Sequence, residues 1–179
     1  NTNSNNALLK IVEEPNEKIF FLLIHNNNKK IIDTLKSRCL TYKINLTFGD
    51  SVHITNKLIN ENILNLLNID LISYYNTPGD FVNLIKFSKL NNLNLNELNL
   101  GNFLSLLINE KYYKKDDFIK LSIFNFIELY FLKIFSQSTY QNNVINFYSK
   151  FIRKINDTNK FNLDHDSLFM ELKSKILNG

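Results

Sequence analysis

The sequence has little of the residues that build disulfides, metal clusters or tight turns. Its 179 residues include one cysteine, two prolines, four glycines and no tryptophan. Because Cys39 stands alone, an intramolecular disulfide or a cysteine zinc cluster cannot be built from this sequence. Scarce glycine and proline, together with few strand-like runs, indicate a mainly helical chain.

Long uncharged apolar runs are also missing. The longest apolar stretch, Phe118 to Phe135, is interrupted by Lys120, Glu128 and Lys133, whereas a membrane helix needs about 18 such residues. No basic segment followed by an apolar one opens the chain, as a secretory signal would require. The expectation is a cytoplasmic protein without a membrane partner.

No phosphate-binding Gly-x-x-x-x-Gly-Lys-Ser/Thr loop occurs in the sequence, and no acidic box that would hold magnesium follows one. Such a loop is what cradles the phosphates of a bound nucleotide. We therefore expect no cofactor, and no activity, for this chain alone. The sequence does not begin with Met, which we interpret as the middle of a larger protein.

What the chain does have is a hydrophobic fraction of 44%, enough for a core, and a formal net charge of +4. This charge permits a nucleic-acid partner without requiring one. About one residue in six is asparagine, which fits either a prion-like tract or an AT-rich genome. Apolar periodicity continues through the asparagine-rich parts and favours the second interpretation.

The opening of the chain combines two motifs with an apolar run between them. Asn6-Ala-Leu-Leu-Lys10-Ile-Val-Glu13-Glu14-Pro15 has helical spacing of apolar residues, and Ser37-Arg38-Cys39 follows. Residues 19–24 are continuously apolar and predict a strand buried on both faces. A short helix over 29–36 and a second strand over 40–44 complete this region.

From residue 46 the pattern is helical. Short helices are predicted over 48–58, 62–67 and 69–75. A further helix is predicted after Thr77, which forms a capping box with Asp80, while Pro78 suits the first helical position. The polar stretch 91–97 is the predicted linker. Helices follow near 98–109, 115–136, 141–156 and 163–177, the second apolar almost all round and hence central, the last capped by Asn162.

The two opening motifs together resemble the clamp-loader branch of the AAA+ ATPases. The resemblance implies a mainly α chain in three pieces: an α/β remnant of the AAA+ core with two strands and two helices (1–45), a helical lid (46–92), and a helical collar used for oligomerisation (97–179). It also implies a role in DNA replication, as part of a DNA polymerase III holoenzyme.

By motif position, Arg38 is the residue that such a family uses as an arginine finger. It would act in trans on the ATP and magnesium held by a neighbouring motor subunit. The interface motif would comprise Ser37, Cys39, Asn6, Lys10, Glu13, Glu14 and Pro15. The alternative is that Arg38 forms a local salt bridge at a strand edge.

Asp80 stands near the place where motor subunits carry a second arginine sensor. A carboxylate there would repel a γ-phosphate, so the resemblance favours a non-hydrolysing subunit. Its implied partners are the gamma/tau and delta subunits, the sliding clamp and primer-template DNA. The rivals are the gamma/tau motor itself, or a helical nucleic-acid-binding or scaffold module.

Other candidate residues point to weaker hypotheses. His53 and His165 lack neighbours at metal-ligand spacing, so no metal site is predicted. His25 and Asn26, at the end of the first predicted strand, are interpreted as a polar surface rather than a phosphate sensor. Lys114-Lys115 and the basic stretch 150–154 could attract phosphates, but the favoured interpretation is that they lie on solvated helix ends and faces.

Overall fold

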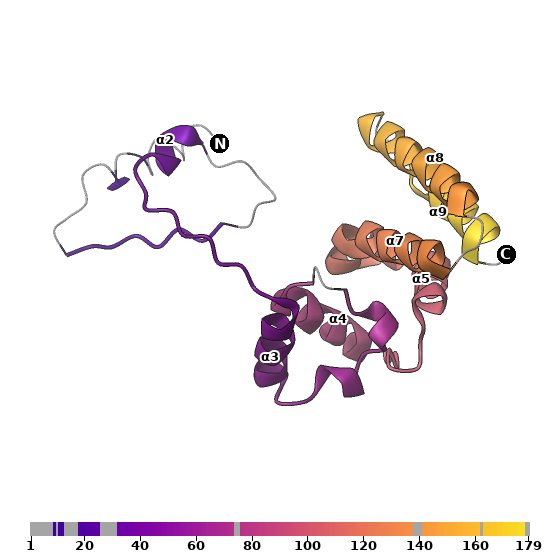
Figure 1. Ribbon diagram of the computed structural model, residues 1–179, viewed down its shortest axis with the longest axis horizontal. Coiled ribbons are helices and arrows are strands. Elements are labelled where there is room, and N and C mark those ends of the chain that lie inside the picture. The colour runs from indigo at the N-terminus through magenta and orange to yellow at the C-terminus, as the bar shows by residue number, and fades with distance from the viewer. Residues whose placement is uncertain are drawn as a thin grey trace. The chain divides into compact units, whose positions relative to one another are not determined.

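The computed structural model describes residues 9, 11–12, 18–25, 32–73, 76–137, 141–161 and 163–177. The chain forms two units, Asn1–Asn45 and Leu46–Gly179 (Figure 1). Over the described part it is mainly helical, as expected, and no strand is assigned there. The predicted boundary between a lid (46–92) and a collar (97–179) falls inside the second unit and stays a prediction.

In the first unit, the two strand predictions are wrong for the described residues. Residues 18–25 and 40–45 are non-helical, and no strand pairs with them in the described part of the chain. Exposure alternates along the first segment, with Phe20 94% and Leu22 87% exposed while Phe21 is 44% exposed. A strand exists only where a neighbouring backbone accepts its hydrogen bonds, and no described residue provides one. The run predicted to be buried is therefore at the surface.

Helix α2 (Asp33–Lys36) is the short helix of this unit, and it occupies the end of the predicted range 29–36. Its N-cap residue, Ile32, has extended backbone and makes no side-chain cap. The helix has four residues, about one turn. Asp33 near its N-terminus and Lys36 near its C-terminus interact favourably with the helix dipole.

The second unit begins with two helices that have capping boxes. Helix α3 (Phe48–Ile59) is capped by Thr47 with Asp50, and α4 (Pro78–Leu90) is capped by Thr77 with Asp80. The prediction for α4 is confirmed: Asp80 N donates to Thr77 Oγ1 at 3.3 Å, and Thr77 N donates to Asp80 Oδ2 at 2.9 Å. Both helix starts are thereby encoded within four residues.

Two short 3₁₀ turns, η1 (Ile63–Asn65) and η2 (Ile69–Leu71), connect these helices. They replace the longer helices predicted over 62–67 and 69–75. Asn68 starts η2 and also binds the 91–97 segment, because its backbone N–H donates to the Leu95 carbonyl at 3.0 Å. Leu95 itself is fully buried. The predicted linker is therefore fastened to the fold.

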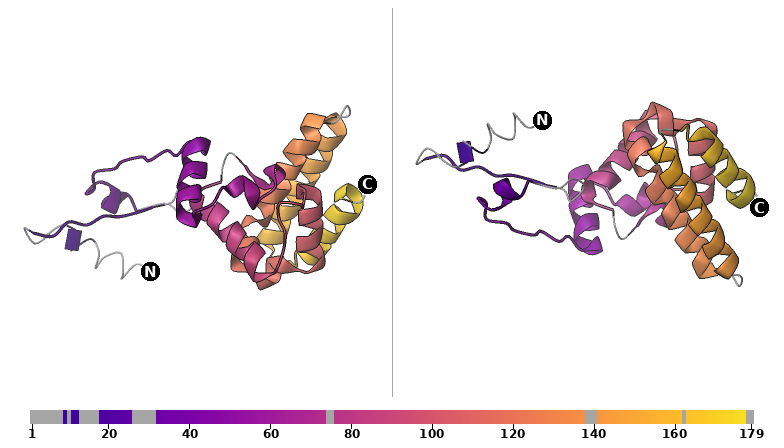
Figure 2. Two further views of the ribbon diagram at one scale, coloured as in Figure 1. Left: turned by 90° about the horizontal axis from the view of Figure 1, so that it is seen from below. Right: turned by 90° about the horizontal axis from the view of Figure 1, so that it is seen from above.

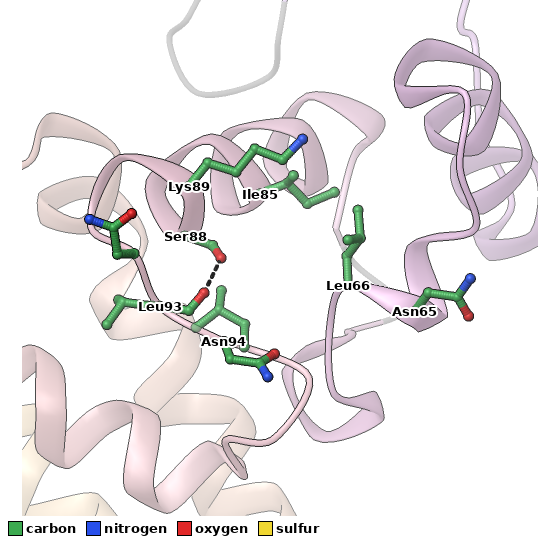
Figure 3. Close-up of a pocket in the computed structure, with 9 residues that line it drawn as sticks. Asn65, Leu66, Ile85, Ser88, Lys89, Leu93 and Asn94 are labelled. Atoms are coloured by element: carbon green, nitrogen blue, oxygen red, sulfur yellow. Dashed lines mark hydrogen bonds between the residues drawn. The ribbon is translucent and has the colours of Figure 1, made fainter.

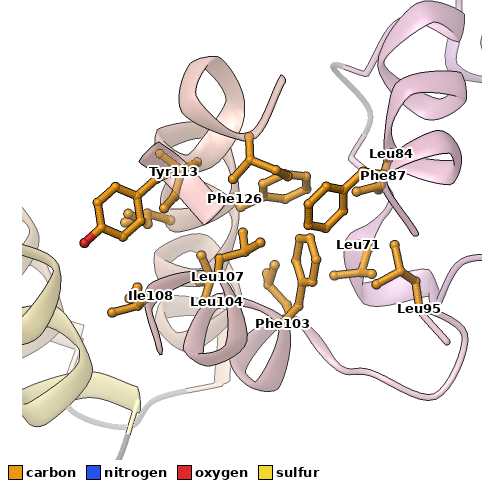
Figure 4. Close-up of a cluster of buried hydrophobic side chains, with 14 of the residues drawn as sticks. Leu71, Leu84, Phe87, Leu95, Phe103, Leu104, Leu107, Ile108, Tyr113 and Phe126 are labelled. Atoms are coloured by element: carbon orange, nitrogen blue, oxygen red, sulfur yellow. The ribbon is translucent and has the colours of Figure 1, made fainter. Parts of the chain in front are cut away.

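One hydrophobic core runs through the second unit. Phe87 of α4 meets Phe103 of α5 (Leu100–Asn109) edge to face at a centroid distance of 6.4 Å. Phe103 in turn meets Phe126 of α7 (Asp117–Gln137) at 5.2 Å (Figure 4). Edge-to-face rings of this kind add to the stability from burial.

Helix α7 is central, as predicted. It contacts α5, α6 (Tyr112–Lys115) and α8 (Gln141–Lys160). Phe131 of α7 packs against three aromatic rings of α8, with the Tyr148 centroid at 5.0 Å. A helix that is apolar on most sides finds partners on most sides.

The last helix starts later than predicted. Helix α9 covers Asp166–Leu172 and passes into a π-helical turn, η3 (Lys173–Leu177). Leu163 belongs instead to the end of α8, because its backbone N–H donates to the Thr158 carbonyl at 2.9 Å. A hydrogen bond from a backbone N–H to the carbonyl five residues earlier is typical of a helix C-terminus. The N-cap residue of α9 is His165; Asn162, the predicted cap, lies outside the described residues.

Candidate functional site

The best-defined candidate site residues lie in the turn that ends α2. The backbone N–H of Ser37 donates to Asp33 O at 3.0 Å, and that of Arg38 donates to Leu35 O at 3.2 Å. These bonds extend the helical turn by two residues. The Ser-Arg-Cys motif thus continues the backbone turn of α2.

The side chains of Ser37 and Arg38 share one acceptor. Ser37 Oγ donates to the Thr34 carbonyl at 3.0 Å, and Arg38 Nη1 donates to the same carbonyl at 2.8 Å. Arg38 is exposed, whereas Cys39 is half-buried. The carbonyl is a neutral acceptor, and this hydrogen bond orients the guanidinium.

Asn6, Lys10, Glu13, Glu14 and Pro15, the other predicted members of the interface motif, lie outside the described residues. Asn26 does so too, while His25 is described and exposed. The structure thus brings together Ser37, Arg38 and Cys39. It leaves the pairing of this turn with the opening motif as a prediction.

Sequence reasoning missed a charged cluster that connects α6 to α9. Asp166 accepts hydrogen bonds from Tyr113 Oη at 2.7 Å and from Lys111 Nζ at 2.9 Å, and it pairs with Lys114 Nζ at 2.7 Å. Lys114 also pairs with Asp164 at 3.2 Å. Lys114, a candidate phosphate-binding residue from the sequence, is therefore paired with the carboxylates of Asp164 and Asp166.

These contacts shift two pKa values in opposite senses. The hydrogen bonds from Lys111, Lys114 and Tyr113 lower the pKa of the Asp166 carboxyl well below its ordinary value. Burial, and then the hydrogen bond to Asp166, raise the pKa of the Tyr113 hydroxyl. A carboxylate receiving three donors and a permanently protonated phenol form a structural contact, since neither exchanges a proton near neutral pH.

A depression of about 500 Å³ lies between η1, α4 and the segment after α4 (Figure 3). Leu66, Ile85 and Leu93 line it, and Ser88 Oγ donates to the Leu93 carbonyl at 2.6 Å. Lys89 is its one charged residue. Without a carboxylate, a histidine or a thiol, this lining offers neither acid–base groups nor metal ligands.

Across the described residues, no three His, Cys, Asp or Glu side chains gather as metal ligands would. His165 lies against aromatic rings, with its centroid 5.7 Å from that of Phe124 and 5.9 Å from that of Phe169. None of the helices in the described part is long and apolar enough to cross a membrane.

Comparison with known proteins places the similarity in the segment that carries Arg38. Residues 1–47 match the family described as "DNA polymerase III, delta subunit". The chain is also 58% identical over 41 residues to the DNA polymerase III subunit delta' of Buchnera aphidicola subsp. Schizaphis graminum. Another delta' subunit, from Buchnera aphidicola subsp. Baizongia pistaciae, is 51% identical over 39 residues. The opening segment is delta-prime-like.

This delta-prime-like segment is short compared with the proteins that it resembles. The two delta' alignments cover 23% and 22% of this chain and 12% of each relative. A third relative, the DNA polymerase III subunit gamma of Buchnera aphidicola subsp. Schizaphis graminum, is 34% identical over 108 residues, or 57% of this chain and 29% of its own length. No solved structure matches the chain.

Proposed function

We propose that the chain is part of a clamp-loader delta-prime subunit, which supplies an arginine finger to a neighbouring ATPase subunit. The observation that carries this proposal is the exposed Arg38 at the end of α2, inside the delta-prime-like segment. A guanidinium is planar and permanently charged, and its fork of N–H donors matches the geometry of a phosphate. Such fingers accelerate phosphoryl transfer by about 10³–10⁵-fold.

Asp80 supports the non-hydrolysing assignment. Its carboxylate accepts hydrogen bonds from the backbone N–H and the hydroxyl of Thr77, at 2.9 and 2.8 Å. The residue near the expected sensor position is thus an acid used to start a helix. An acid in this position would weaken, not stabilise, a bound γ-phosphate.

The gamma/tau motor subunit is the second candidate, because the similarity to the gamma relative extends over 57% of the chain. The two subunits differ in whether they bind ATP themselves. We therefore propose ATP and magnesium as cofactors of a neighbouring subunit, with gamma/tau, delta, the sliding clamp and primer-template DNA as partners, in the cytoplasm.

Assembly tests the proposal. The full-length gene product should co-purify with gamma/tau and delta in one complex on size-exclusion chromatography. The isolated full-length protein, without the other subunits, should show no photocrosslink to azido-ATP if it is a delta-prime subunit. Crosslinking at the level of the motor would instead assign the chain to gamma/tau. Failure to enter any complex would favour the helical nucleic-acid-binding or scaffold module.

A further inference from the structure

The outward face of α8 is basic and rich in amides. At helical spacing, the row that points away from α7 consists of Asn142, Asn146, Ser149, Arg153, Asn156 and Lys160. Lys150 lies beside this row, and like Arg153 and Lys160 it is exposed. Asp157 is the one acidic residue of the whole helix. Figure 2 shows α8 at the surface of its unit.

The cations of α8 divide into two kinds. Lys154 is used within the fold, because its Nζ pairs with Glu171 Oε2 at 2.5 Å. Lys150 and Arg153 form no ion pair with any described residue. Lys160 rests over the Phe161 ring, 5.3 Å from its centroid, and keeps its charge. We call Lys150, Arg153 and Lys160 the α8 basic face.

The spacing of these charges suits an extended polyanion. Ten residues separate Lys150 from Lys160, which corresponds to about 15 Å along a helix axis. Duplex DNA carries one negative charge per about 1.7 Å of its axis. Several phosphates can therefore lie opposite the face at once, and the amides of Asn142, Asn146 and Asn156 along the row can donate to phosphate oxygens.

The same face is poorly suited to a protein partner. Stable protein interfaces depend on buried aromatic or aliphatic anchors. Ile145 is the large apolar residue of α8 that is most exposed, at 45%, and it lies off the row. Phe147 and Phe151 point inward against Phe131. Phe161 follows the helix and is 62% exposed, but Lys160 Nζ lies over its ring. Cations and amides make up the row itself and favour phosphates over a peptide.

We propose that the α8 basic face binds the phosphodiester backbone of DNA without reading its sequence. The proposal rests on the proposed function only in taking DNA as the polyanion. It requires neither Arg38 nor any other subunit. The face adds a weak, salt-sensitive contact, of the kind that positions a protein on DNA rather than selecting a site.

Fluorescence anisotropy of a labelled DNA duplex, titrated with the 179-residue chain over a series of salt concentrations, tests the proposal. The slope of the log binding constant against log salt concentration is negative. The triple variant Lys150→Gln/Arg153→Gln/Lys160→Gln should make it shallower by about 2 to 3, about one for each lost phosphate contact. Asp157→Asn, which removes the acid beside the row, should tighten binding. Circular dichroism checks that each variant keeps its helices.

The matched control is Lys57→Gln/Lys86→Gln/Lys89→Gln, which removes the same charge from exposed positions of α3 and α4. An equal loss of slope in this control would reduce the effect to net charge and overturn the proposal. So would a triple variant that binds the DNA duplex with the affinity and salt dependence of the unmodified chain. Because the assay contains neither ATP nor other subunits, its failure leaves the loader-assembly test unaffected.

Discussion

Tyr113 and Asp166 are 53 residues apart in sequence, yet Tyr113 Oη donates to Asp166 Oδ1 at 2.7 Å. The phenol ring is nearly buried, at 7% exposure, and lies edge to face with Phe169, 4.5 Å between centroids. One residue therefore contributes both a packed ring and a charge-assisted hydrogen bond. Together these contacts hold α9 against α6.

Tyr113→Phe keeps the ring and removes the hydroxyl. We expect the free energy of unfolding to fall by about 1 kcal/mol, below the usual value for a hydrogen bond to a charged group because Asp166 is partly exposed. Urea denaturation followed by circular dichroism measures it. Tyr112→Phe is the control, since Tyr112 contacts Phe87 through its ring, and it should change stability by less than about 0.5 kcal/mol.

Asp166 should also make stability depend on pH in acid. Its pKa is lower in the folded protein than in the unfolded chain, so the unfolded state binds more protons as the pH falls below about 4. The stabilisation is complete above that value and is lost as pH decreases toward the folded pKa. Asp166→Asn should therefore flatten the fall in stability between about pH 5 and pH 2.5.

Glu171 is the internal control for this pH dependence, because the hydrogen bonds from Lys154 and Lys175 also lower the pKa of its carboxyl. Part of the acid dependence should persist in Asp166→Asn and decrease further in the double variant with Glu171→Gln. The share due to Asp50, whose pKa is also lowered by its hydrogen bonds with Thr47, should remain. Urea midpoints at each pH provide the measurement. Parallel curves for the parent chain and Asp166→Asn would contradict the argument.

The capping box of α4 gives a local prediction. Thr77→Ala removes the hydroxyl that accepts from Asp80 N, and a lost cap costs about 1 kcal/mol. Thr77→Ser, which keeps the hydroxyl, should restore most of the stability. Thermal unfolding distinguishes the two. Equal destabilisation by both variants would mean that the methyl group, not the cap, stabilises the helix start.

The exposed apolar segments of the first unit should bind a hydrophobic dye. Phe20, Leu22 and Ile24 are each at least 87% exposed, so Phe20→Asp/Leu22→Lys/Ile24→Thr should lower ANS fluorescence of the 179-residue chain. Unfolding of the second unit should be unchanged, because exposed substitutions cost little. If the variant instead lowered the free energy of unfolding by several kcal/mol, these side chains would be buried, as a core strand requires.

What the sequence predicts well is local. Thr77 and Asp80 define a helix start within four residues, and the apolar residues of α7 on nearly every side place it centrally. Helix α6 is four residues long and carries too little periodicity to be predicted. The Asp166 cluster depends on residues more than fifty positions apart, which no local pattern encodes.

The failures have the same physical origin. An apolar run such as residues 19–24 has the composition of a buried strand, but a strand forms only when another backbone lies beside it. The late start of α9 reflects the closure of α8 by Leu163 and Thr158. The sequence motif indicates Ser37, Arg38 and Cys39 as site residues. The structure adds the Thr34 carbonyl, which accepts hydrogen bonds from the side chains of Ser37 and Arg38.

The central claim is that Arg38 acts on a triphosphate held by another subunit. Its most direct test is DNA-stimulated ATP hydrolysis by a loader reconstituted with the full-length protein carrying Arg38→Ala, beside Lys36→Ala as an exposed cationic control from the same turn. We expect normal assembly with both variants, and hydrolysis that falls at least tenfold at the site facing Arg38 only in Arg38→Ala. Hydrolysis equal to that of the unmodified loader would contradict it.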